Sequence, residues 1–366
     1  MFPKSAVDQH PALGVATTYQ KMFHWDFISM EPLLDQAEAL LQNPSFPIEE
    51  TRRLNLLQDV DIQRAFFFYW RGDIQAALRL ARQSISVIPK EHRYAHNLAV
   101  LYSALAEALS GRRDEALQLL SEALIEDCAE CSRNAGVFLV AQTGVYYYAG
   151  DLNAVEVTAK QILSVHETVS VPDFWYVYAP YFLACSAYER NLLDTAAEHF
   201  GQVEQMRYVI STRLYQDALM GLALAAWAKG ETDRARECAV AAHSFALENS
   251  DPYSLQIANS FQIRMAILSG NVRGDPAETA PPEDDSNKVW LEIPSLTLAE
   301  YQVHQSTMAE CTAALQSVED GLQQAKFSGP VGAIAYLQAR KEFTFHQHQI
   351  GRHQQQSNQN HAQFNY

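Results

Sequence analysis

A turn residue returns about every 40 residues along most of the chain, a spacing within the range of helical-pair repeats. The turn residues are Gly72, Gly111, Gly150, Asn191, Gly230 and Gly270. Glycine and asparagine adopt the left-handed backbone conformation that ends a helix and redirects the chain. This periodicity predicts a series of antiparallel helix pairs joined at these residues.

The residues around each turn support this interpretation. A small residue stands seven positions before five of the turns, where two helices must approach closely: Ala65, Ala104, Thr143, Ala184 and Ala223. An alanine also follows each of these turns: Ala77, Ala116, Ala154, Ala196 and Ala235. Alanine and leucine dominate the apolar residues, and both favour helices over strands. We therefore expect an all-α fold.

We expect four regions along the chain. A helical repeat array covers residues 1–271, and it includes an additional helical pair from Ala12 to Asn43, whose leucines have helical spacing. Residues 272–288 form an acidic linker that contains prolines. Helical repeats continue the array over 289–351, starting at Trp290, and 352–366 form a disordered tail rich in Gln, Asn and His.

The charge balance argues against several classes of partner. The chain has 43 acidic and 27 basic residues and a formal net charge of −16, so its surface repels phosphate backbones and anionic membranes. No apolar stretch reaches the roughly 18 residues of a membrane span, and the N-terminus lacks the apolar core of a signal peptide. Five cysteines, an odd number, favour free thiols. We expect a cytoplasmic protein without direct nucleic-acid or membrane binding.

The sequence contains no motif typical of a catalytic or metal site. Cys128 and Cys131 form a lone Cys-x-x-Cys without the second ligand pair that zinc requires, so we interpret them as incidental thiols. His346, His348 and His353 do not share one helix face, and we interpret them as incidental too. We expect no enzyme activity, no metal and no cofactor.

The repeats resemble the tetratricopeptide repeat (TPR), which combines a small residue in its first helix, aromatic residues near the end of that helix, a glycine turn and an alanine in its second helix. This resemblance implies a right-handed superhelical solenoid whose inner wall is built from the first helix of each pair. The residues that it assigns to this wall are Asp59, Phe66, Tyr69, Trp70, Tyr147, Tyr178, Tyr181, Tyr188, Asp217, Met220, Trp227 and Arg264. One helical turn further out it assigns Arg133, Phe174, Arg213 and Tyr253. Aromatic side chains with a few charges suit a sugar-like ligand or a peptide, although such aromatics also commonly pack between repeats.

Three stretches resemble a narrower family, the MalT-like bacterial transcription activators of the LuxR group: residues 65–73, 188–193 and 291–299. In that family a helical-repeat region binds an inducer or partner proteins and relays the event to an ATPase module and a DNA-binding module. The sequence shows neither the Gly-x-x-x-x-Gly-Lys-Ser/Thr phosphate loop nor a helix-turn-helix. The resemblance therefore implies the sensor or scaffold region of such a regulator.

These observations leave two main hypotheses. The first is a sensor that captures a small molecule or a protein segment in a concave groove and changes its curvature in response. The second is a constitutive protein–protein scaffold that senses no small molecule. An enzyme with a solenoid fold is a third hypothesis, but the sequence offers no cluster of catalytic groups to support it.

Overall fold

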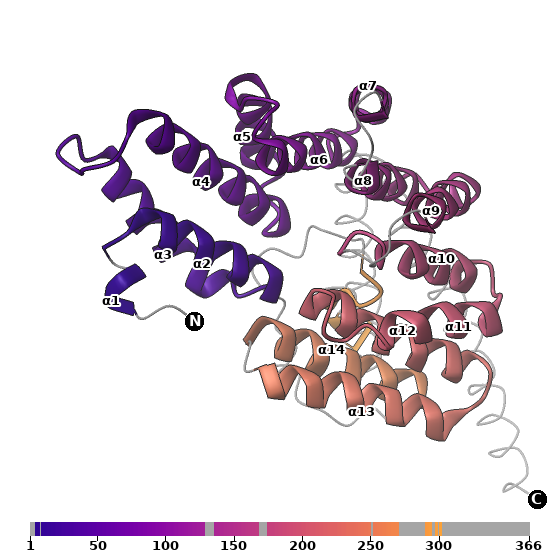
Figure 1. Cartoon of the computed structure of the whole chain (residues 1–366). Helices are drawn as coiled ribbons and strands as arrows, with labels where there is room; N and C mark the ends of the chain where they lie inside the picture. The colour runs from indigo at the N-terminus through magenta and orange to yellow at the C-terminus, as the bar shows by residue number, and fades with distance from the viewer. Residues whose placement is uncertain are drawn as a thin grey trace, which may run out of the picture.

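The computed structural model describes residues 4–7, 9–128, 135–167, 174–249, 252–270, 290–294, 297–298 and 300–301. Throughout these residues the protein is all-α, with no β-strand, and it forms an array of helices joined by short turns (Figure 1). The helices are α1 (Lys4–Val7), α2 (Pro11–His24), α3 (Phe27–Gln42), α4 (Glu50–Trp70), α5 (Ile74–Val87), α6 (Arg93–Leu109), α7 (Arg113–Cys128), α8 (Ala135–Tyr148), α9 (Leu152–Glu167), α10 (Tyr178–Glu189), α11 (Leu193–Glu204), α12 (Thr212–Ala228), α13 (Thr232–Asn249) and α14 (Pro252–Leu268).

The predicted turn residues join or end these helices as the sequence indicates. All of them have positive φ angles, between 60° at Asn191 and 88° at Gly72. The first pair, α2 and α3, turns in the same way at Trp25, which has a φ of 60° although its side chain is large. The array of helix pairs is therefore confirmed, and its first turn uses a residue that the glycine pattern did not reveal.

Polar side chains begin several of the helices. The carboxylate of Asp73 accepts a hydrogen bond from the backbone N–H of Ala76 at 2.9 Å, and Asp151 accepts one from Ala154 at 3.1 Å. Such N-terminal caps satisfy backbone donors that have no partner within the helix. In the pairs α2–α3, α4–α5 and α8–α9, a residue with positive φ ends the first helix and an aspartate caps the second, which fixes the reversal between them.

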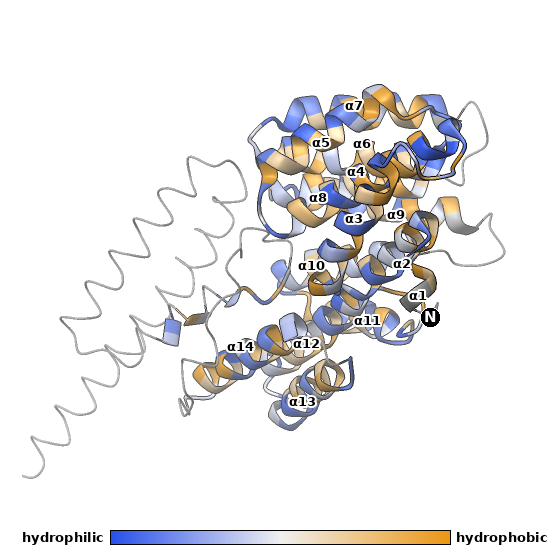
Figure 2. Cartoon of the chain, turned by 90° about the vertical axis from the view of Figure 1, so that its left-hand side faces the viewer, coloured by the Kyte–Doolittle hydropathy of each residue, from blue (hydrophilic) through white to orange (hydrophobic). Residues whose placement is uncertain are grey.

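The helix pairs form two layers. Each even-numbered helix from α2 to α12 packs against the next even-numbered one, which makes a continuous inner row, while the odd-numbered helices α5 to α13 lie outside it (Figure 1). The small residues seven positions before the turns are completely buried between helices, as close packing requires. The helices carry both hydrophilic and hydrophobic stretches along their length (Figure 2).

The two ends of the inner row meet, so the array curves back on itself. Helix α2 contacts α12, and the hydroxyl of Thr212 donates a hydrogen bond to the backbone carbonyl of His24 at 2.9 Å. The rings of Phe27 and Tyr253 lie 6.1 Å apart, which connects the start of α3 with α14. The curvature therefore encloses an inner face that is bordered by α2 and α4 on one side and by α10, α12 and α14 on the other.

The predicted domain boundaries fall mainly outside the described residues: this holds for the linker at 272–288, for residues 302–351 and for the tail at 352–366. Where the structure describes the start of the region predicted as C-terminal repeats, Trp290 to Ile293 are not helical and helical backbone begins at Pro294. Proline is favoured in the first turn of a helix, which accounts for this position. Within the described part of the chain, no helix is long and apolar enough to cross a membrane.

Candidate binding site on the inner face

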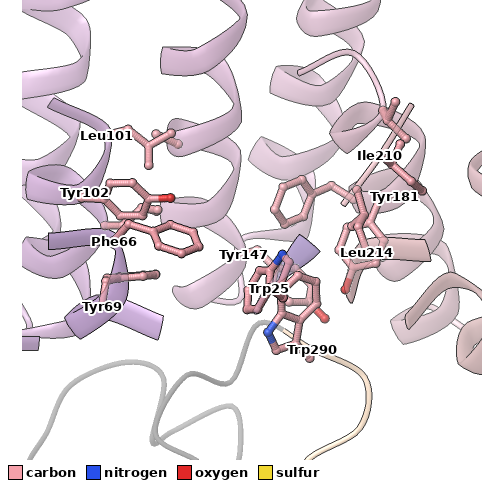
Figure 3. Close-up of a cluster of buried hydrophobic side chains, with 14 of the residues drawn as sticks. Trp25, Phe66, Tyr69, Leu101, Tyr102, Tyr147, Tyr181, Ile210, Leu214 and Trp290 are labelled. Atoms are coloured by element: carbon pink, nitrogen blue, oxygen red, sulfur yellow. The ribbon is translucent and has the colours of Figure 1, made fainter. Parts of the chain in front are cut away.

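A segment of the chain itself, residues 290–293, lies on the inner face. We call it the inner segment. The indole of Trp290 packs against three aromatic rings that come from distant parts of the array, with centroid distances of 5.5 Å to Trp25, 5.5 Å to Trp70 and 6.1 Å to Tyr181. Only 8% of Trp290 is exposed. Figure 3 shows Trp290 beside Trp25, between the group around Phe66 and the group around Tyr181.

Side chains of α12 and α14 bind the main chain of the inner segment. The backbone N–H of Leu291 lies 3.2 Å from one carboxylate oxygen of Asp217 and 3.3 Å from the other. Its carbonyl oxygen accepts a hydrogen bond from Nη1 of Arg264 at 2.6 Å. One peptide donor and one peptide acceptor are thus satisfied by groups of opposite charge on neighbouring helices, and this type of contact does not depend on the side chain at position 291.

The carboxylate of Glu292 is completely buried in a polar socket. Its Oε1 accepts hydrogen bonds from the hydroxyls of Ser260 at 2.6 Å and Thr297 at 2.8 Å, and its Oε2 lies 3.4 Å from Nη1 of Arg264. Burial raises the pKa of Glu292, while Arg264 and the two hydroxyls act in the opposite direction. A buried carboxylate costs free energy unless a cation and hydrogen-bond donors surround it, and this socket supplies both.

An ion pair at the base of the inner face supports these contacts. Arg213 and Asp217 are 1% and 0% exposed, and Nη2 of Arg213 lies 3.3 Å from Oδ1 of Asp217. Tyr181 donates a hydrogen bond to Asp217 at 2.6 Å, and the Arg213 guanidinium lies 4.7 Å from the centre of the Trp290 ring. Burial raises the pKa of Asp217, and the charge of Arg213 offsets part of this effect. The pair orients Asp217 toward Leu291 and places a cation under the indole.

The residues predicted for the inner wall divide into two groups by exposure. Buried residues are Phe66, Tyr69, Tyr147, Tyr181, Arg213, Asp217 and Met220. Partly exposed residues are Asp59, Trp70, Phe174, Tyr178, Tyr188, Trp227, Tyr253 and Arg264, and Arg133 lies outside the described residues. The structure brings Trp70, Tyr181, Arg213, Asp217 and Arg264 together around the inner segment, and it does not bring the others into one site.

Several of the other predicted residues make contacts within the array instead. The hydroxyls of Tyr69 and Tyr148 are 2.5 Å apart, and the rings of Phe174 and Tyr178 are 5.5 Å apart. The first pair links α4 with α8, and the second links the turn before α10 with the first residue of that helix.

Asp59 belongs to a separate polar group near α2. It accepts a hydrogen bond from Tyr19 at 2.9 Å and lies 3.4 Å from Nε2 of His92. Burial raises the pKa of Asp59, and the nearby His92 lowers it.

Sequence reasoning missed five side chains of the site: Trp25, Ser260, Trp290, Glu292 and Thr297. The glutamate within the apolar run from Trp290 to Ile293 was a usable signal, because a charged residue between apolar neighbours needs a buried partner. Trp25 gave no signal of this kind, since its position depends on how far the array curves.

The described residues offer little support for catalytic or metal chemistry. They contain no group of three or more His, Cys, Asp or Glu side chains that could hold a metal ion. Cys185 is completely buried, and burial raises the pKa of its thiol well above the usual range, which disfavours the reactive thiolate. Cys131 and the histidines at 346, 348 and 353 lie outside the described residues.

A curved array of antiparallel helix pairs, with a small residue at each crossing and a polar and aromatic inner face, defines a TPR-like helical repeat protein. The family model described as the MalT-like TPR region matches residues 58–341. The chain belongs to this family. A comparison with curated protein sequences gave no match.

A solved structure with a TM-score above 0.5 has the same fold at low sequence identity. A Rap protein complexed with the competence and sporulation factor has 12% identity and a TM-score of 0.52, and the match covers 93% of this chain and 99% of that one. The TPR-like repeats of a putative kinesin light chain from Podosopora anserina have 17% identity and a TM-score of 0.40, with coverage of 56% and 99%.

Proposed function

We propose that the chain is a non-enzymatic binding module that captures an extended protein segment on the inner face of its helical array. The observation that carries this proposal is the binding of Leu291 through both its N–H and its carbonyl group by Asp217 and Arg264. Side chains that bind the N–H and the carbonyl group of one residue can hold an extended peptide through its main chain.

Two further observations support the proposal. Trp25, Trp70 and Tyr181 offer a large aromatic surface that suits the side chain of a bound segment. The Rap protein, which has a similar fold, is complexed with the competence and sporulation factor. In a MalT-type regulator of a bacterial cytoplasm, capture of a segment would bias the curvature of the array, and ATPase and DNA-binding modules would respond.

A small-molecule inducer is the second candidate ligand, and Arg213 is the observation that favours it. Within the described residues, none of its three buried guanidinium nitrogens has a hydrogen-bond partner. A carboxylate or phosphate group that reached Arg213 would satisfy these donors. Such a ligand and a protein segment would compete for the same face.

Selection from a random peptide library, with the full chain and its Trp290→Ala variant as targets, tests the main proposal. We expect the enriched peptides to bind with dissociation constants of roughly 1–100 μM, as a short segment with few anchors does. Arg264→Met should weaken this binding at least ~10-fold, which is the loss of one charge-assisted hydrogen bond. Ile125→Ala, at an exposed position of the outer helix α7, is the control and should leave binding unchanged.

Two results would contradict the proposal: no enriched peptide binds either target, or Arg264→Met and Ile125→Ala have equal effects. Enrichment of no peptide together with a thermal shift caused by small carboxylates or sugar phosphates would favour the second candidate.

A further inference from the structure

We infer that the partner segment carries a large aromatic residue followed two positions later by an acidic residue, and that Trp290 and Glu292 occupy its site within the chain until such a segment displaces them. This inference rests on the proposed function and names the chemistry of the partner. Three subsites on the inner face carry it.

The first subsite selects an aromatic side chain. Trp70 stacks on Trp290 with an angle of 28° between the ring planes, whereas Trp25 and Tyr181 meet it at 75° and 61°. Arg213 adds a cation–π contact at 4.7 Å, which is strongest with tryptophan among the aromatic residues. A leucine or methionine in this place would lose both the stacking and the cation–π contact.

The second subsite binds the main chain, and it also gives the side chain a partly buried contact with the hydrophobic core. Asp217 and Arg264 hold the N–H and the carbonyl group of Leu291, while the Leu291 side chain is partly exposed. The middle position of the motif therefore depends on its main chain first, and an apolar side chain suits it.

The third subsite selects an acidic side chain. Ser260 and Arg264 both belong to α14 and not to the inner segment, so another carboxylate can bind them in place of Glu292. A glutamine would keep the hydrogen bond from Ser260 but would lose the charge that faces Arg264. An uncharged partner would also leave Arg264, whose side chain is 17% exposed, without this counter-ion.

The inner segment competes with a partner because it is part of the same chain. A segment of the same chain has a high effective concentration at its site, so a free segment of equal intrinsic affinity binds weakly. The same contacts join α2, α4, α10, α12 and α14 across the inner face. Displacement of the segment would therefore remove a connection between the two ends of the array and expose the Arg213–Asp217 pair to the partner.

Fluorescence anisotropy with a labelled nonapeptide of the sequence of residues 290–298 tests the inference. The peptide is titrated into the full wild-type chain and into a full chain with Trp290→Ala and Glu292→Gln, which empties the aromatic subsite and removes the charge from the acidic one. We expect the double variant to bind the peptide at least ~10-fold more tightly than the wild type, because the internal competitor is lost. Ile125→Ala introduced into the double variant is the control for a general effect of substitution.

Two altered peptides test the motif. One replaces the tryptophan with alanine and the other replaces the glutamate with glutamine, and each should bind the double variant at least ~10-fold more weakly than the original peptide. Circular dichroism and thermal unfolding establish that the double variant is folded, and Glu292→Gln alone supplies a milder variant with the same expected direction.

Equal affinity of the wild type and the double variant would overturn the internal competition, and equal affinity of the glutamate and glutamine peptides would overturn the acidic subsite. If the random library yields inner-face ligands that lack an aromatic-x-acidic motif, this inference fails while the proposed function stands. If neither the library nor the nonapeptide gives a ligand, both fail.

Discussion

At the scale of single residues, the inner face depends on one buried ion pair. Arg213 and Asp217 are one helical turn apart on α12, and neither is accessible to solvent. Asp217 serves two further groups, since it also accepts hydrogen bonds from Tyr181 and from the backbone of Leu291. Removal of one charge from such a pair leaves the other buried without compensation, which costs more free energy than the intact pair contributes.

Asp217→Asn should lower the free energy of unfolding by about 3 kcal/mol, because it leaves the Arg213 guanidinium buried without a counter-ion. Urea unfolding monitored by circular dichroism measures this change. Arg213→Met combined with Asp217→Asn should cost less than the sum of the two single substitutions. A loss below about 1 kcal/mol for Asp217→Asn would mean that Arg213 is not buried as described.

The two buried carboxylates also predict how stability depends on pH. The pKa values of Asp217 and Glu292 are raised in the folded protein above the ordinary 3.8 and 4.5, mainly by burial. The folded state therefore binds the protons of these two carboxyl groups more firmly than the unfolded state does. As a consequence, the free energy of unfolding falls as the pH rises from the ordinary pKa values through the raised pKa values of the folded protein.

Comparison with Glu292→Gln isolates the contribution of Glu292. Between about pH 4 and about pH 8 the wild type should lose more stability than Glu292→Gln, which no longer has the titrating group. Denaturant unfolding at both pH values measures the difference. Parallel pH profiles of the two proteins would contradict the burial of this carboxylate.

At the scale of helices and turns, the repeat pattern of the sequence was sufficient to predict the architecture. Gly72 and Asn191 mark turns because a left-handed backbone costs glycine and asparagine less than other residues. Ala65 and Ala223 mark the crossings of neighbouring helices because larger side chains would hold the helices apart. Both signals are local in the sequence.

The site was only partly predictable, because its contacts are not local. Tyr181, Arg213 and Asp217 were predicted as site residues because they stand at the repeat positions that form the inner wall of a TPR array. Their partners Trp25 and Trp290 are separated by most of the chain, and they meet because the curvature of all the pairs adds up. Local sequence patterns do not show the total curvature of the array. The sequence therefore did not reveal that residues 290–293 lie on the inner face, and this segment was expected to be helical.

Two helical glycines on adjacent helices should respond to alanine in opposite directions. A Cβ atom at Gly221 of α12 would lie 2.5 Å from the ring of the buried Phe200, whereas a Cβ at Gly201 of α11 would meet nothing within 4 Å. Alanine gains up to about 1 kcal/mol over glycine inside a helix, but overpacking of a core costs about 1–3 kcal/mol. Gly221→Ala should therefore lower the thermal midpoint and Gly201→Ala should raise it.

Calorimetry of the two variants measures both shifts under the same conditions, with each substitution serving as the control for the other. A rise in the midpoint for both would indicate that α11 and α12 are packed less closely than the structure shows.

At the scale of the whole molecule, the array of helix pairs curves until α2 reaches α12, and the inner segment joins the elements that meet there (Figure 1). Because each pair in a repeat protein contacts mainly its neighbours, small rotations between pairs add up to large changes between the ends. A segment that connects α2, α4, α10, α12 and α14 opposes such changes. Its displacement by a partner would convert a local binding event into a change of curvature, which is the property that a sensor needs.

Hydrogen–deuterium exchange at the Leu291 amide tests the central claim most directly, because this N–H is the donor to Asp217. In the wild-type chain it should exchange at least ~100-fold more slowly than in an unstructured peptide, as expected of a buried hydrogen-bonded amide. Trp290→Ala, or an excess of the nonapeptide, should remove most of this protection. Exchange of the Leu291 amide in the wild type at the rate of an unstructured peptide would contradict the account.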